Sequence, residues 1–283
     1  MVTDAIWSDY DTDGDLDLIV VGEWMPISIF DNEKGTLTKR ETEEFKTSNG
    51  WWFSIEKGDF DNDGDDDFIV GNLGLNHKYK TSTEKPFDIY YDDFDNNGSG
   101  DIVLGYYNNG KHYPLRGFSC SSEQIPGLKE NFKKYDVFAS LELKEVYGEA
   151  NLSKALTYKA DTFKSLYIEN LGGGHFKSSP LPYFTQLSNI NDWLIDDFNS
   201  DGNLDILGAG NLHEFEIETP RNDAGKGFLL IGDGTGNFET STTIKSGFNA
   251  SGNAKYLKRL STSAGEYILI GNNNNSLQSF KRR

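Results

Sequence analysis

Short apolar runs alternate with polar, glycine-containing segments along most of the chain. Within residues 5–45 the runs are Ala5–Asp9, Leu16–Val21, Ile27–Asp31 and Leu37–Arg40. They are rich in β-branched and aromatic residues, and each is too short for an ordinary helix, so they read as strands. The pattern therefore predicts a unit of four short strands near the N-terminus.

Similar runs recur further along the chain and predict more strands of the same kind. They are Trp51–Ile55, Phe68–Gly71, Phe87–Tyr91, Ile102–Tyr107, Ser165–Asn170, Asn191–Asp197, Ile206–Gly210, Gly227–Ile231, Asn237–Thr240, Ala254–Leu260, Glu266–Ile270 and Leu277–Lys281. The predicted fold class is therefore all-β.

Residues 118–160 break this pattern. Apolar residues there recur at mixed three- and four-residue spacing, with Lys and Glu between them. That spacing is typical of amphipathic helices. We expect two or three helices, inserted in the β fold or capping it.

A nine-residue acidic pattern separates pairs of the predicted strands at residues 9–17, 59–67, 93–101 and 197–205. Every copy has oxygen-bearing side chains at positions 1, 3, 5 and 9, an aromatic residue at position 2 and Gly at position 6. The copies start 50, 34 and 104 residues apart. A period near 50 is propeller-like, and 104 is about two periods. One period after Asp197, near residues 249–253, the acids are gone, which indicates a repeat without a metal loop.

The pattern indicates calcium. Several carboxylates within nine residues repel one another unless a cation lies among them, and Ca²⁺ takes about six to eight oxygen ligands. Side chains 1, 3, 5 and 9 would be ligands, position 7 would offer its carbonyl, and Gly at position 6 would allow a sharp turn. The candidate ligand residues are Asp9, Asp11, Asp13, Asp15, Asp17; Asp59, Asp61, Asp63, Asp65, Asp67; Asp93, Asp95, Asn97, Ser99, Asp101; and Asp197, Asn199, Asp201, Asn203, Asp205. We expect up to four structural Ca²⁺ ions, with weaker binding in the last two loops.

Two other interpretations of the loops were weighed. An EF-hand needs a Glu at position 12 followed by a helix, but position 12 is Val20, Val70, Leu104 and Gly208, and the loops lead into strand-like residues. A plain Asp-Gly hairpin turn with solvated acids is the other interpretation, and four copies in register argue against it. The loops contain no His or Cys, which disfavours zinc and copper.

The sequence D-x-D-x-D-G-x-x-D between strands, with a following N-x-x-G-x-[FL] hairpin, resembles the FG-GAP/VCBS repeat. The segments Gly22–Ile27, Gly50–Trp52 and Gly71–Asn76 further resemble large exported bacterial VCBS-repeat proteins. The resemblance implies an integrin-α-like β-propeller, here with a helical insertion around 118–160, as a single domain over residues 1–283. Asn97 and Asn199, where the motif has carboxylates, depart from the pattern.

Composition narrows the partners and the location. The net charge is −18, and the loops hold 17 Asp, so most of the excess is local. Such a chain is not expected to bind nucleic acid or to insert into a membrane. One cysteine, Cys120, allows no internal disulfide. The chain enters a strand almost at Met1, so we expect a piece of a longer protein. Weak calcium loops favour an extracellular, periplasmic or outer-surface location.

Catalytic motifs are weak. We therefore favour a non-enzymatic module that recognises a protein or glycan ligand, and the alternative is a polysaccharide lyase or hydrolase. The alternative would use Tyr106, Tyr107, His112 and Arg116 as its acid–base set. Glu214, Glu216 and Asp223, near His213 and Arg221, form a second candidate cluster, although solvated loop charges explain it equally simply. Trp24, Trp51, Trp52 and Trp193 suit either core packing or sugar stacking.

Overall fold

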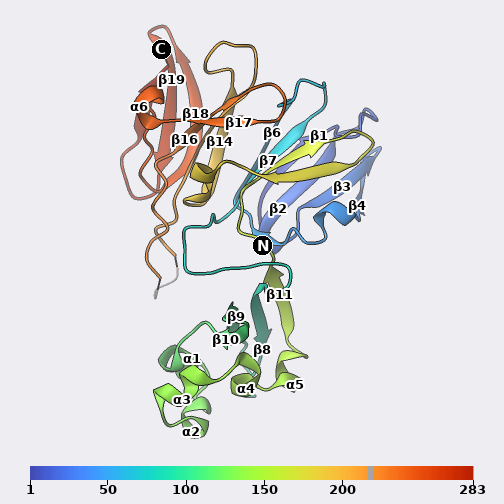
Figure 1. The fold of residues 1–283 in the computed structure, drawn as a ribbon. Coiled ribbons are helices and arrows are strands. Elements are labelled where there is room, and N and C mark those ends of the chain that lie inside the picture. The colour runs from blue at the N-terminus through green and yellow to red at the C-terminus, as the bar shows by residue number, and fades with distance from the viewer. Residues whose placement is uncertain (216–218, 283) are drawn as a thin grey trace. The chain divides into compact units, whose positions relative to one another are not determined.

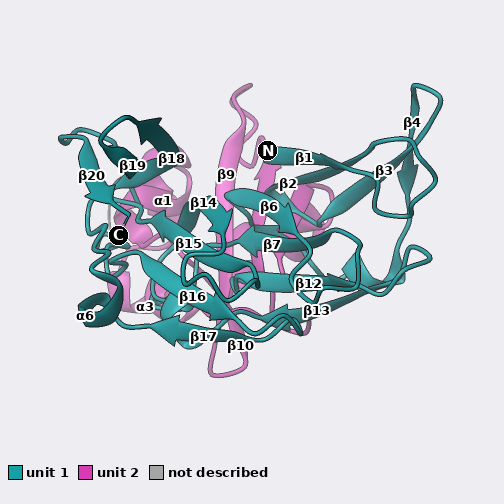
Figure 2. Ribbon diagram, turned by 90° about the horizontal axis from the view of Figure 1, so that it is seen from above, with its two compact units in different colours: residues 1–78, 163–283 teal, residues 79–162 magenta. Residues whose placement is uncertain are grey.

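The computed structural model describes residues 1–215 and 219–282. Its contacts divide the chain into two compact units, shown in different colours in Figure 2. Unit 1 contains residues 1–78 and 163–283, and unit 2 contains residues 79–162. The expected single domain over residues 1–283 stays a prediction beside these two units.

Unit 1 is built mainly from antiparallel strands (Figure 1). Its strands are β1 Val2–Ser8, β2 Asp17–Met25, β3 Ser28–Glu33, β4 Thr36–Arg40, β5 Gly50–Trp51, β6 Ser54–Gly58, β7 Asp67–Gly71, β12 Leu166–Asn170, β13 Phe176–Pro180, β14 Ile190–Asp196, β15 Asp205–Gly210, β16 Phe228–Gly232, β17 Phe238–Ser241, β18 Ala254–Thr262, β19 Gly265–Asn272 and β20 Gln278–Lys281. Three short helical turns accompany them: η1 Glu43–Phe45, η2 Tyr183–Gln186 and α6 Thr243–Ser246.

The strands of unit 1 form four sheets. Their orders are β1-β2-β3-β4 with β5 beside β2, then β6-β7-β12-β13, β14-β15-β16-β17 and β18-β19-β20. The first strands contact one another in chain order: β1 contacts β6, β6 contacts β14, and β14 contacts β18. Within the described residues each sheet is open rather than closed on itself. The predicted β class is confirmed.

Unit 2 combines one sheet with short helices. The sheet order is β10-β9-β8-β11, and a core around Val103, Leu143 and Tyr147 fills the unit. Its elements are β8 Phe87–Asp92, β9 Asp101–Asn108, β10 Lys111–Pro114, α1 Phe118–Gln124, α2 Leu128–Asn131, α3 Tyr135–Ser140, α4 Leu143–Tyr147, α5 Glu149–Leu152 and β11 Leu156–Ala160. In the described part of the chain, no helix is long and apolar enough to cross a membrane.

The predicted helical segment is partly correct. Residues 118–152 hold five short helices instead of two or three longer ones, and residues 156–160 form a strand instead of a helix. Leu156–Ala160 pairs antiparallel with β8, from Leu156 opposite Tyr91 to Ala160 opposite Phe87. The helical pattern was therefore overridden by pairing with a strand about 65 residues earlier in the chain.

Unit 2 explains the uneven spacing of the acidic loops. The start of the second loop, Asp59, and the start of the fourth, Asp197, lie 138 residues apart, and 84 of those residues belong to unit 2. The remaining 54 residues match the interval of 50 between the first two loops. The third loop, which starts at Asp93, lies in unit 2, so it does not continue the series of unit 1.

The metal loops of unit 1 join the first strand of a sheet to the second. In the fourth sheet the same connection is Ser263–Ala264, between β18 and β19. The repeat without a metal loop therefore has its missing loop here, and the position expected from the period, residues 249–253, is wrong. Those residues lie before β18, because the period fixes the length of a repeat only to within a few residues.

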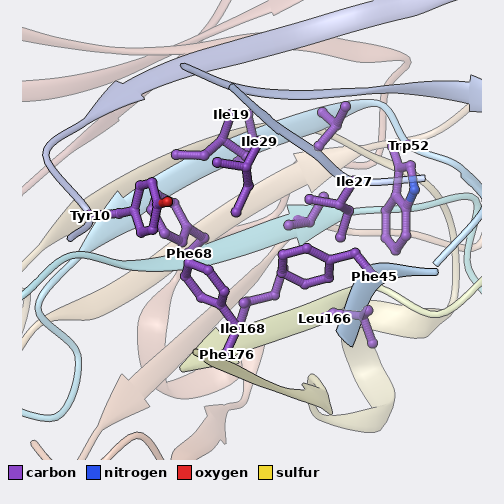
Figure 3. Close-up of a cluster of buried hydrophobic side chains, with 13 residues drawn as sticks. Tyr10, Ile19, Ile27, Ile29, Phe45, Trp52, Phe68, Leu166, Ile168 and Phe176 are labelled. Atoms are coloured by element: carbon purple, nitrogen blue, oxygen red, sulfur yellow. The ribbon is translucent and has the colours of Figure 1, made fainter. Parts of the chain in front are cut away.

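The core between the first two sheets is drawn in Figure 3. Ile19 and Ile29 of the first sheet face Phe68 and Ile168 of the second. Trp52 closes one end of this core, is fully buried, and donates its indole N–H to the Ser48 carbonyl at 3.0 Å. The core thus joins neighbouring sheets face to face.

We predict that Trp52→Ala lowers the free energy of unfolding of unit 1 by about 3–5 kcal/mol, because it removes a large, fully buried side chain. Trp7→Ala is the matched control, since Trp7 is 49% exposed, and it should change the free energy by about 0.5 kcal/mol. Chemical denaturation followed by circular dichroism measures both. Equal losses in the two variants would contradict the assigned core.

Candidate metal centre

The four acidic loops share one backbone conformation. The Gly at position 6 has a positive φ in every copy: Gly14 96°, Gly64 98°, Gly98 88° and Gly202 92°. Only glycine adopts such angles at little cost, which confirms the reason for its place in the motif. Position 4 is left-handed as well, at Thr12, Asn62, Asn96 and Ser200. The sequence pattern gave no warning of this, because position 4 shares no side-chain type.

The first carboxylate of each loop accepts the N–H of the position-6 glycine. Gly64 donates to Asp59 at 3.2 Å, Gly98 to Asp93 at 2.8 Å, and Gly202 to Asp197 at 2.9 Å. Gly14 likewise donates to Asp9, at 3.2 Å. These bonds hold the loop around the first aspartate, so its carboxylate is positioned before any ion binds.

The carboxylates converge in three of the loops. Three residues in each loop place one oxygen apiece within 4.8 Å of one another: Asp9, Asp11 and Asp17; Asp59, Asp61 and Asp63; and Asp93, Asp95 and Asp101. Asp13 and Asp67 are not members of these groups. The fourth loop supplies no such group among the described acidic residues, and Asn199 occupies its third position.

The position-9 aspartates have a second role that the sequence did not indicate. They are buried, with exposed fractions of 1% for Asp17, 0% for Asp67, 3% for Asp101 and 0% for Asp205. In three sheets this carboxylate accepts an N–H from the third strand: Asn32 to Asp17 and Asn170 to Asp67 at 2.8 Å, and Gly232 to Asp205 at 3.0 Å. The residue therefore ties the loop to a strand that lies beyond its immediate neighbour.

The first loop contains an oxygen suited to a cation. Oδ2 of Asp17 is buried and has no hydrogen-bond partner in the part of the chain that the structure describes. Burial, followed by the charges of Asp11 and Asp13, raises the pKa of Asp17 to about 6. A buried, unpaired oxygen of this kind is costly unless a cation or donor reaches it, so the donor set fits a hard, oxygen-preferring ion.

The second loop shows the same strain at position 7. Oδ1 of Asp65 is buried without a hydrogen-bond partner within the described residues. Burial and then the charge of Asp63 raise the pKa of Asp65 to about 6. Position 7 of the other loops contacts its neighbours instead: Asp15 accepts the Lys34 N–H at 3.1 Å, and Asn203 accepts the Asn62 side chain at 3.1 Å. The last contact joins the second and fourth loops directly.

The alternative acid–base set is only partly assembled. The rings of His112 and Tyr107 stack at 4.4 Å, and Nε2 of His112 lies 2.9 Å from Oδ1 of the buried Asp88. Tyr106 follows Tyr107's neighbouring position in β9 and points to the opposite sheet face, where it contacts Tyr113. Arg116 bonds instead to Gln124 at 3.4 Å.

The remaining candidates divide between core and surface. Trp52 and Trp193 are buried in hydrophobic clusters, whereas Trp24 and Trp51 are half-buried and meet edge to face at 5.0 Å. His213, Glu214 and Arg221 line one cavity. Asp223 is exposed, and Glu216 lies outside the described residues.

A comparison with family models agrees with this geometry. The model of the FG-GAP-like repeat matches residues 9–70, from the first aspartate of the first loop to the strand after the second loop. This protein carries an FG-GAP-type repeat. A search of the curated proteins finds no match. The FG-GAP match covers the region in which two acidic loops alternate with the first two sheets of unit 1.

We predict that Asp67→Ala strongly destabilises unit 1 even with chelator present. Asp67 accepts the Tyr167 hydroxyl at 2.7 Å, the Asn170 N–H at 2.8 Å and the Phe60 N–H at 3.2 Å. Leaving these buried donors unpaired should cost about 3 kcal/mol or more. Tyr167→Phe, which removes one of the bonds, should cost about 1 kcal/mol.

Urea denaturation in excess EGTA measures both losses without a contribution from metal. Exposed Asp13→Ala is the control and should have little effect under the same conditions. A loss for Asp67→Ala no larger than that of Asp13→Ala would show that Asp67 is not the structural connection described above.

Proposed function

We propose that the protein is a calcium-stabilised β-propeller module of an exported bacterial protein, and that it recognises a protein or glycan ligand. The FG-GAP-type repeat supports a repeat-built binding module. Function on such a scaffold depends on its surfaces rather than on the fold itself. The proposed location is extracellular, periplasmic or on the outer cell surface.

The observation that carries the calcium proposal is the buried Oδ2 of Asp17, which lacks a hydrogen-bond partner among the described residues, beside the grouped oxygens of Asp9 and Asp11. All the donors are oxygens, as Ca²⁺ prefers, and the loop is flexible enough in geometry to suit Ca²⁺ better than Mg²⁺, which demands a near-ideal octahedron. An ion there would cancel the repulsion that the carboxylates exert on one another.

The arrangement of unit 1 supports the propeller proposal. In a propeller the first strands of successive sheets surround a central channel. Here β1, β6, β14 and β18 contact one another in that order, and residues of all four strands, such as Ile6, Glu56, Asp192 and Lys258, line a cavity of about 540 Å³. Four sheets of this kind would form successive blades.

We predict that calcium raises the melting temperature of the protein and that EGTA lowers it. A ligand that binds only the folded state stabilises it by mass action, by about 2.7 kcal/mol for one site at a hundred times its dissociation constant. Asp61→Ala removes an oxygen of the second group and should reduce the shift caused by calcium, while its melting temperature in EGTA stays near that of the wild type.

Thermal melts of the wild type, Asp61→Ala and the control Asp233→Ala test this expectation. Asp233 lies in an exposed hairpin turn outside the three carboxylate groups, so its loss should leave the calcium shift intact. An unchanged wild-type melt in excess EGTA would count against the calcium proposal as a whole.

The second candidate function is a polysaccharide lyase or hydrolase, and the Asp88–His112 contact is the observation that favours it. A carboxylate that orients an imidazole is a common arrangement for a general base, and Tyr107 stacks on that ring. Incubation with polysaccharides should release no new reducing or unsaturated ends if the protein only binds. Release that is abolished in His112→Ala would establish the enzyme.

A further inference from the structure

A polar cavity of about 410 Å³ lies against the sheet β18-β19-β20, at the red end of the colour scale in Figure 1. Two segments line it: the connection after β15 contributes His213, Glu214 and Arg221, and the fourth sheet contributes Asn253 and the turn Asn273–Asn275. Its volume lies within the range of about 300–1,000 Å³ that small-molecule sites occupy. The cavity is separate from every acidic metal loop.

The connection that carries these side chains is fixed at its base. Leu212 and Asn222 exchange two backbone hydrogen bonds, at 2.9 and 3.0 Å. Asn211, which is fully buried, donates its side-chain amide to the carbonyls of Gly225 and Gly252, both at 2.9 Å. Residues at the base of the connection are therefore held in place, as a binding site on a loop requires.

Amide and carboxylate groups meet in the cavity. Oε2 of Glu214 accepts the Asn253 side chain at 2.8 Å, and Oε1 accepts the Asn273 side chain at 3.1 Å. Oδ1 of Asn253, which is only 1% exposed, has no hydrogen-bond partner among the described residues. The bond from Asn253 also lowers the pKa of Glu214, so this carboxylate stays charged and oriented.

The charges in the cavity favour a neutral ligand. Glu214 and Arg221 carry opposite charges, and both Glu214 oxygens are already bonded to asparagines. The net charge of −18 repels anions from the molecule as a whole. Side-chain amides both donate and accept hydrogen bonds, as the adjacent hydroxyls of a sugar do.

An aromatic surface continues from the same segment. Phe215 follows Glu214 and is half-buried, and its ring meets that of Trp51 edge to face at 6.3 Å. Trp51 in turn contacts the half-buried Trp24. Aromatic faces pack well against the C–H faces of sugar rings. A ligand with hydroxyl groups and apolar ring faces would match both the cavity and this neighbouring surface.

From this combination we infer that the cavity lined by His213, Glu214, Arg221, Asn253 and Asn273–Asn275 binds a neutral oligosaccharide. The inference rests on the proposed function as a recognition module and names its ligand class. The sugar hydroxyls bond to Arg221 and to the asparagine side chains, and Glu214 holds two of those asparagines in the binding orientation.

The test is an array of neutral and anionic oligosaccharides in calcium-containing buffer, followed by titration calorimetry with the neutral glycan that binds most strongly. Arg221→Ala and Glu214→Gln should each weaken that binding by about tenfold or more, since each loses a hydrogen bond to a charged group or the orientation that it sets. Gln can accept only through one oxygen, so it cannot hold both asparagines.

Two variants of the same connection serve as matched controls. Lys226→Ala removes a positive charge and Asp223→Asn removes a negative charge, both from exposed residues, and neither should alter binding. Melting temperatures equal to that of the wild type confirm that all four variants fold.

The outcomes separate this inference from the proposed function. Selective loss in Arg221→Ala and Glu214→Gln supports the site. Neutral-glycan binding that survives both variants overturns the site but leaves a glycan-binding module. Binding of anionic glycans alone, or of no glycan, overturns the inference, and the recognition function then depends on a protein ligand. An absent calcium shift in the melts affects the proposed function alone.

Discussion

The burial of one carboxylate at the end of each acidic loop is the constraint on which unit 1 depends. Asp17, Asp67 and Asp205 are each the first residue of the second strand of a sheet, and each accepts an N–H from the third strand. A buried charge is tolerated only when hydrogen bonds and a counter-charge surround it. The backbone supplies the hydrogen bonds, and a cation held by the rest of the loop would supply the charge.

This arrangement links local sequence to the packing of whole sheets. The loop fixes where the second strand begins, and the buried aspartate fixes the third strand relative to it. Contacts between loops then extend the order from sheet to sheet, as Asn62 bonds to Asn203 and Asn170 donates to the Tyr10 carbonyl at 2.8 Å. An acidic motif that looks purely like a metal site is therefore also a structural joint of the fold.

The sequence was sufficient to predict most strands, the four loops and the glycine at position 6, because these depend on local periodicity and turn chemistry. It did not reveal unit 2 as a separate body. The partner of Leu156–Ala160 is a strand about 65 residues away, and no local pattern encodes that pairing. The strand Lys111–Pro114 was missed for a similar reason, since it is short and gains its order from β9.

The candidate site shows the same division. The ligand positions could be read from spacing, but the burial of position 9 and its bonds to the third strand arise only when the sheet is assembled. Likewise, His213, Glu214 and Arg221 were visible as a cluster in the sequence. Their link to Asn253 and Asn273 requires the fourth sheet, which the sequence does not place beside them.

The central claim is that the acidic loops hold calcium as part of the folded structure. Isothermal titration of chelator-stripped protein with calcium chloride tests it most directly, because it counts sites without reference to stability. Three carboxylate groups and a fourth, weaker loop predict saturable binding at three or four sites per chain. Fewer than three sites, or no heat of binding beyond dilution, would contradict the account.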